Sequence, residues 1–119
     1  MNYIGKIWFK KPIKMKKVAE KMGLEDIAVY KTEDMIGTMK WRGADILILI
    51  HISWGDMDNV EKIRILAHHL EDTEADEFFR LVMTMFRDIA VEAILSREKI
   101  DDMTKREIGR IGSTCVLEV

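Results

Sequence analysis

The first half of the chain alternates short apolar segments with turn-forming residues, a pattern typical of β-strands joined by tight connections. Apolar and β-branched residues predict strands over 3–9, 26–31 and 35–41. Pro12 is expected to close the first strand, because proline has no N–H to donate to a neighbouring strand. The sequence therefore predicts a β-rich N-terminal half.

The segment 46–53, ILILIHIS, carries the clearest strand pattern in the chain. Its four isoleucines share one face, because successive side chains of a strand point to opposite faces. The other face carries Leu47, Leu49, His51 and Ser53. Both faces are largely apolar, which predicts a central strand that is covered on two sides.

Helical spacing first appears over 14–22. The apolar residues from Met15 to Met22 recur on one helix face, and Gly23 follows in the position of a helix C-cap. Because this helix lies between the first two predicted strands, we expect a β-α-β unit whose strands are parallel neighbours joined by a right-handed crossover.

Two longer helices are predicted in the second half of the chain. Asp58 and Glu61 resemble a capping box, and the apolar residues that follow them at helical spacing predict a helix over 58–71. A second cap-like pair, Thr73 and Asp76, opens a 3.6-residue period that predicts one long helix over 73–97.

The apolar arc of this long helix is wider than packing on a single sheet requires. We therefore expect its outer side to meet a partner. The candidate interaction residues are Phe78, Leu81, Met85 and Leu95.

A short helix over 100–112 and an edge strand over 113–119 complete the predicted elements. No repeat, linker or low-complexity tract divides the sequence, so we expect a single α+β domain over 1–119. The predicted fold class is two-layer, with a mixed β-sheet of 4–5 strands that opens with β-α-β and packs against the long C-terminal-half helix.

Composition narrows the class of protein. With 119 residues, 48% of them apolar and 34% charged, the chain has the balance of a globular domain. It shows no signal-peptide pattern and no apolar run that could cross a bilayer, so we expect a cytoplasmic protein without membrane contact. Cys115 is the single cysteine, which excludes an intrachain disulfide. The absence of glutamine favours a thermophilic source, whereas the nine methionines argue against one.

The stretch LAHHLEDTEADEFF (66–79) suggests a metal site. On a helix, His68 would share a face with Glu71 and Asp72, a spacing suited to a divalent ion. A protein metal site needs at least three converging ligands, however. We therefore favour a structural interpretation, in which the acids open one helix and the histidines close the preceding one. No cofactor is predicted.

The stretch HISWGDMD (51–58) follows the central strand at the place where open α/β sheets commonly bind ligands. Its polar groups could serve a small metal- or ligand-binding enzyme, although a histidine in an apolar strand is more often structural. The candidate pocket residues are His51, Ser53, Trp54, Asp56 and Asp58. No serine stands in a G-x-S-x-G motif, so no catalytic set can be assigned.

A lysine-rich segment near the N-terminus is the third candidate. Lysines beside aromatic residues can bind phosphates while a ring stacks on a base. The segment lacks arginine and the whole chain is acidic, so nucleic acid is not the expected partner and a solvated face is the simpler interpretation. Its members are Lys10, Lys11, Lys14, Lys17 and Lys21.

The functional hypothesis that the sequence favours is a non-enzymatic domain that works by protein association, with a second copy of itself or with another protein. The wide apolar arc supports it, as does the net charge of −2, which combines a basic first half with an acidic second half. The alternatives are an enzyme centred on His51, Asp56 and Asp58, and a nucleic-acid accessory protein that uses the N-terminal lysines.

Overall fold

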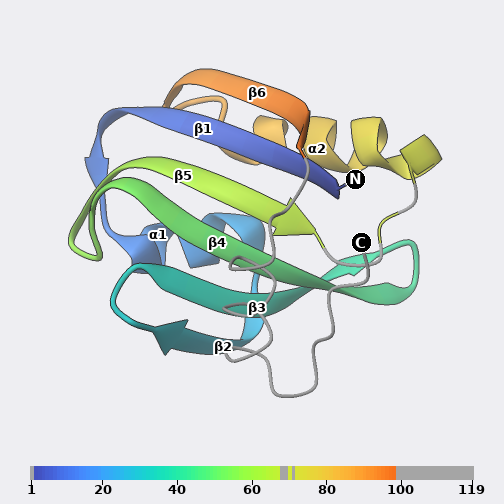
Figure 1. The fold of residues 1–119 in the computed structure, drawn as a ribbon, viewed down its shortest axis with the longest axis horizontal. Helices are drawn as coiled ribbons and strands as arrows, with labels where there is room; N and C mark the ends of the chain where they lie inside the picture. The colour runs from blue at the N-terminus through green and yellow to red at the C-terminus, as the bar shows by residue number, and fades with distance from the viewer. Residues whose placement is uncertain (1, 68–69, 71, 99–119) are drawn as a thin grey trace.

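A computed structural model describes residues 2–67, 70 and 72–98. Figure 1 shows a six-stranded sheet with two helices packed against one of its faces. Every strand pair is antiparallel, and the strand order is β2-β3-β4-β5-β1-β6. Along the chain, the elements are β1 (Asn2–Ile13), α1 (Met15–Met22), β2 (Glu25–Tyr30), β3 (Asp34–Trp41), β4 (Ala44–Asp56), β5 (Asn59–Ala67), α2 (Asp72–Met85) and β6 (Ala90–Glu98).

This architecture shows that the predicted fold class was wrong. The sheet is antiparallel rather than mixed, and the described residues contain two short helices in place of a long one. β1 and β2 are not parallel neighbours, because β3, β4 and β5 lie between them. Helix α1 carries the chain across the covered face to the far edge, and tight turns then bring it back strand by strand.

Strands predicted in the first half are confirmed as β1 to β4, with different ends. Helix α1 is confirmed with its C-cap: Gly23 is left-handed at φ 63°, and its N–H donates to the Glu20 carbonyl. The predicted end of the first strand at Pro12 was wrong, since β1 continues to Ile13. Pro12 is tolerated because the register of β1 with β5 is irregular between Trp8 and Ile13.

The predicted helix over 58–71 was wrong, because its described first part is the strand β5. Trp54 and Gly55 of β4 pair with Lys62 and Val60 of β5, so Glu61 is an extra residue, a β-bulge. The bulge places Val60 and Ile63 on the same face at a separation of three residues. That spacing imitates a helix.

The predicted helix over 73–97 was wrong beyond Met85, where α2 ends. A turn over 86–89 leads into β6, and the amide of Ala90 donates to the Phe86 carbonyl at 2.8 Å. Another bulge explains the error. Trp8 of β1 pairs with Glu92 and Phe9 pairs with Ala90, which leaves Val91 as the extra residue. Ala90 and Ala93 therefore share a face three residues apart, again at helical spacing.

The last two predicted elements, over 100–112 and 113–119, lie outside the described residues, as do 68–69 and 71 of the predicted helix over 58–71, whereas Leu70 is described and is not helical.

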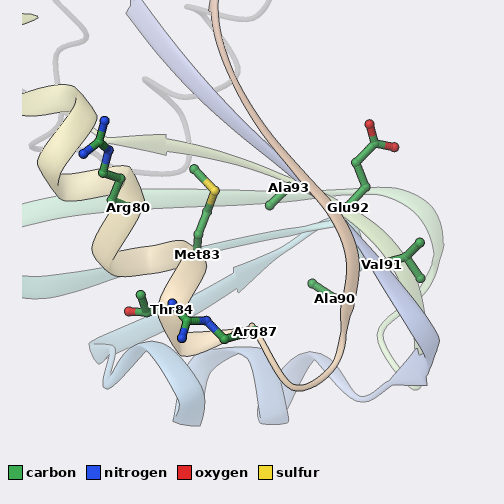
Figure 2. Close-up of a pocket in the computed structure, with 8 residues that line it drawn as sticks. All are labelled: Arg80, Met83, Thr84, Arg87, Ala90, Val91, Glu92 and Ala93. Atoms are coloured by element: carbon green, nitrogen blue, oxygen red, sulfur yellow. The ribbon is translucent and has the colours of Figure 1, made fainter.

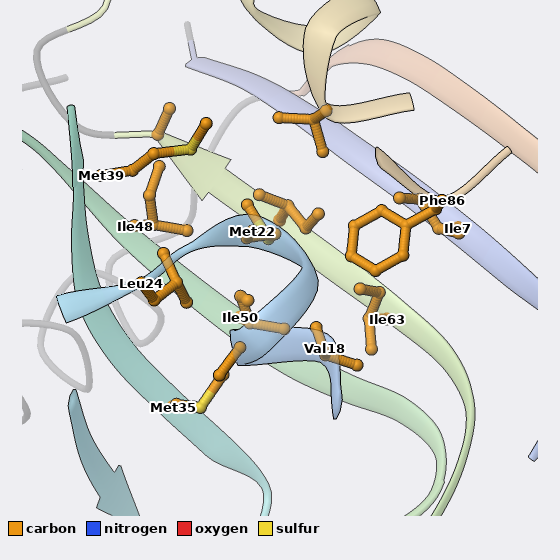
Figure 3. Close-up of a cluster of buried hydrophobic side chains, with 14 of the residues drawn as sticks. Ile7, Val18, Met22, Leu24, Met35, Met39, Ile48, Ile50, Ile63 and Phe86 are labelled. Atoms are coloured by element: carbon orange, nitrogen blue, oxygen red, sulfur yellow. The ribbon is translucent and has the colours of Figure 1, made fainter. Parts of the chain in front are cut away.

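The core fills the space between the helices and the sheet (Figure 3). Val18 and Met22 of α1 pack over the isoleucines of β4 and β5. Phe79 of α2 lies directly over Gly5 of β1, where an added Cβ would stand 2.7 Å from the Phe79 ring. Glycine therefore lets α2 approach β1 closely. Along its length, α2 contacts both β1 and β6.

The opposite face of the sheet carries a second, smaller apolar cluster. Ile4 and Leu66 are buried there, with Leu47 and Leu49 packed against them. This arrangement confirms the prediction that the strand over 46–53 has two apolar faces.

Candidate functional site

The candidate histidine of β4 forms a pair with a carboxylate that the sequence did not suggest. The antiparallel register places Asp34 of β3 opposite His51, and the distance from His51 Nδ1 to Asp34 Oδ1 is 2.6 Å. Among the described residues, Asp34 is the charged residue that is buried from solvent. The hydrogen bond to Asp34 raises the pKa of His51 above its ordinary value, with burial acting in the opposite sense.

Asp34 fixes the orientation of the His51 ring through Nδ1 and leaves Nε2 for other contacts. This is the geometry that general acid–base catalysis uses, but a reaction also requires further groups around the ring. Ser53 lies where the β4–β5 register is irregular, and its buried Oγ has no hydrogen-bond partner. Trp54 is exposed.

The acids of the predicted pocket lie at the β4–β5 turn instead. Asp56 Oδ1 accepts hydrogen bonds from the backbone N–H groups of Asp58 and Asn59, at 2.9 and 3.0 Å. This is an Asx-turn, a local structural role. His51 and Asp56 are five residue steps apart along the strand, which is roughly 16 Å. The structure therefore divides the predicted pocket between a strand face and a turn.

The metal hypothesis stays a prediction. His68 lies outside the described residues, and Asp72 is the first residue of α2. Within 2–67, 70 and 72–98, no group of three histidine, cysteine, aspartate or glutamate side chains could hold a metal ion.

The lysines of the N-terminal segment divide between solvent and a structural contact. Lys21 Nζ lies 3.0 Å from Asp88 Oδ1 and 3.4 Å from the Met85 carbonyl oxygen. Lys10 Nζ lies 3.4 Å from the Asp88 carbonyl oxygen. These two lysines hold the turn between α2 and β6. The others, which are exposed on β1 and around α1, are Lys11, Lys14 and Lys17.

The four predicted interaction residues do not form one surface. Phe78 is fully buried, edge-on to Trp41, because it faces the sheet from α2. Leu81 is 38% exposed, whereas Met85 and Leu95 are partly buried against the core. Since the helix ends at Met85, Leu95 belongs to β6 rather than to the face on which it was predicted.

Sequence reasoning missed a groove of about 540 Å³ between α2 and β6. In Figure 2, α2 and the turn after it supply one wall, and the start of β6 supplies the other. Arg80 and Arg87 stand toward the two ends of the helix wall, with Met83 between them. The lining residues are Arg80, Met83, Thr84, Arg87, Ala90, Val91, Glu92 and Ala93.

The groove has a cause in the sequence. Ala90 and Ala93 are the first two β6 residues on the helix side, before Leu95, and their short side chains leave space above the edge of the sheet. Arg80 and Arg87 are seven residues apart, the first on α2 and the second in the turn after its end at Met85, and both line the groove. That spacing was a detectable signal, but it acquires meaning only once the segment after Met85 is known to be an edge strand.

In the described part of the chain, no helix is long and apolar enough to cross a membrane. Comparison of the chain with protein-family models, with curated proteins and with solved structures found no match.

Proposed function

We propose that this protein is a protein-association domain that pairs with an extended segment of a partner along the outer edge of β6. The observation that carries the proposal is the edge itself. β6 ends the sheet, and its register with β1 is regular from Glu92 to Glu98. Among the described residues, no strand pairs with its other side.

An edge strand exposes unpaired N–H and C=O groups that a further strand can bind, and proteins normally protect such edges with lysine, proline or a covering element. The segment from Glu92 to Glu98 contains neither lysine nor proline, and its charged residues, Glu92, Arg97 and Glu98, stand at its two ends. Val91 and Ile94 are exposed apolar residues on this strand. The edge therefore lacks the usual protection over its uncharged middle, from Ala93 to Ser96.

The other edge of the sheet is less suited to strand pairing. The register of β2 with β3 shifts between Glu25 and Ala28, and Asp26 has a left-handed backbone at φ 51°. Only Ala28 to Tyr30 pair regularly with β3. A short, interrupted edge of this kind disfavours the addition of a strand.

Strand addition predicts slower amide hydrogen exchange along 92–98, because a paired N–H is no longer open to water. We would measure exchange in dilute protein, in concentrated protein, and with an extended peptide of alternating threonine and valine. The same peptide, N-methylated at every residue, serves as its control, since neither of its edges can then donate hydrogen bonds to the ladder. Slower exchange at β6 with unchanged exchange at β2 is the expected result.

Matched variants test the location. Val91→Lys places a lysine on the proposed edge, and Val29→Lys does the same on β2, where the exposed fraction is 58% compared with 68% for Val91. Val91→Lys should abolish the slowing and Val29→Lys should not. If neither concentration nor peptide slows exchange at β6, or if both variants act alike, the proposal is wrong.

A further inference from the structure

Two arginines beside the β6 edge have no counter-ion among the residues that the structure describes. Arg80 and Arg87 both line the groove. Neither guanidinium group has an ion pair or hydrogen bond within the described residues, whereas Arg42 binds both Glu74 and Glu77. As far as the described residues extend, the groove therefore presents two positive charges that a ligand could meet.

The acids that follow Arg87 along the chain do not neutralise this charge. Asp88 is bound to Lys21 at 3.0 Å. Glu92 lines the groove from β6 but pairs in register with Trp8, so it lies on the sheet face away from α2, and Figure 2 shows it directed away from the arginines.

We propose that the groove binds an acidic, extended segment of another protein, which adds to β6 as a strand and directs two carboxylates toward Arg80 and Arg87. This inference rests on the proposed function and names the chemistry of the partner. The backbone of the segment pairs with the β6 edge, and its side chains on the helix side enter the groove. A carboxylate is the natural ligand of a guanidinium group, which offers parallel N–H donors.

Spacing defines the pattern of the segment. Arg80 lies on α2, whereas Arg87 lies in the tight turn after that helix, where its amide donates to the Thr84 carbonyl. At a rise of roughly 1.5–2 Å per residue, the seven residue steps between them correspond to roughly 10–14 Å. In a strand, side chains four residues apart are roughly 13 Å apart on the same face, a difference that the long arginine side chains can absorb. The residue midway between the acids would lie over Met83 and Ala93, so it should be apolar. The expected motif is acid-x-apolar-x-acid.

A second copy of the chain fits this groove poorly. Pairing of two β6 strands around a twofold axis would bring two α2 helices side by side, within about 10 Å. Each helix would present Arg80 and Arg87, and the acid in line with them at helical spacing is Asp76. Two acids would then face four arginines. Charge complementarity favours a foreign acidic segment over self-association.

The test uses two synthetic peptides with blocked ends and the full-length protein. One contains Glu-Thr-Val-Thr-Glu between threonine-rich flanks, and the other replaces both glutamates by glutamine. Calorimetry or NMR titration gives their affinities. We expect the glutamate peptide to bind about tenfold more tightly, since two partly exposed ion pairs contribute roughly 1–2 kcal/mol together. Added salt should reduce that advantage.

Protein variants locate the charge. Arg80→Gln and Arg87→Gln should each weaken binding of the glutamate peptide by a few-fold and leave the glutamine peptide unaffected. Lys16→Gln removes one positive charge from an exposed position on α1 and is the matched control. These are exposed positions, so each variant should keep the circular dichroism spectrum of the parent protein.

Each other outcome counts against the inference in a recognisable way. Equal binding of both peptides would refute the acidic partner but keep strand addition. Failure of both peptides, together with self-association that Val91→Lys disrupts, would assign the edge to a second copy and again keep the proposed function. Failure of both peptides in a protein that does not self-associate would overturn the inference and the proposed function together.

Discussion

Substitution of Gly5 by alanine should destabilise the protein, because this glycine determines how closely α2 lies over the sheet. The φ angle of Gly5 is not in the left-handed region, so alanine is allowed by the backbone. The obstacle is the added Cβ. It would lie 2.7 Å from Cε1 and 2.8 Å from Cδ1 of Phe79, against a favourable carbon–carbon separation of roughly 3.5–4.0 Å.

The Phe79 ring would have to move by about 1 Å to relieve this contact. It has little room, since Phe79 is buried and stands edge-on to Phe78, with ring centroids 5.2 Å apart. Phe78 in turn packs edge-on against Trp41. Overpacking of this kind costs roughly 1–3 kcal/mol, and we expect Gly5→Ala to lower the free energy of unfolding by about 2 kcal/mol.

Urea denaturation measures this loss as a lower midpoint with an unchanged m-value. A double-mutant cycle with Phe79→Leu isolates its cause, because leucine removes the ring atoms that the new Cβ would meet. The two substitutions together should cost at least about 1 kcal/mol less than the sum of their separate effects. Additive effects, or a Gly5→Ala protein within about 0.5 kcal/mol of the parent, would refute the argument that this contact positions α2.

Three further predictions follow from the described contacts. Because the pKa of His51 is raised, its pair with Asp34 should contribute its full stability below pH 6.5 and lose it as the pH rises through the folded-state pKa. Denaturation at several pH values should show this slope, and Asp34→Asn should remove it. Lys21→Met should accelerate amide exchange over 86–90 and return the pKa of Asp88, which the Lys21 hydrogen bond lowers, toward its ordinary value by NMR titration. Gly55→Ala should cost about 3 kcal/mol or more in thermal or chemical unfolding, because Gly55 has φ 105° and a Cβ there would collide with the Asn59 carbonyl oxygen.

The sequence predicted local structure well where strands and helices keep a regular period. Four strands and α1 were found because alternation, helical spacing and Gly23 each have a direct local cause. Partner choice within the sheet was not predictable in the same way. A right-handed crossover to the neighbouring strand was the expected path, whereas α1 leads to the far edge, and that choice depends on contacts between distant segments.

The candidate site was predicted only in part for a related reason. His51 was identified from its place in an apolar strand, but its partner Asp34 is seventeen residues earlier and meets it only through the β3–β4 register. Asp56 and Asp58 were grouped with His51 by proximity in sequence, and an extended chain separates such residues. Proximity along a strand is a poor guide to proximity in a site.

The bulge at Val91 connects the main sequence error with the proposed function. By inserting one residue opposite Trp8 and Phe9, it keeps Ala90 and Ala93 on the helix side at a separation of three residues, so the strand reads as a continuation of α2. The same two alanines leave the space that becomes the groove. If the chain continued as a helix, there would be neither an open edge nor a groove. Arg80 and Arg87 would then lie on an ordinary solvated face. Once the segment is a strand, those arginines flank an open edge, and the surface acquires both a shape and a charge that a partner can recognise.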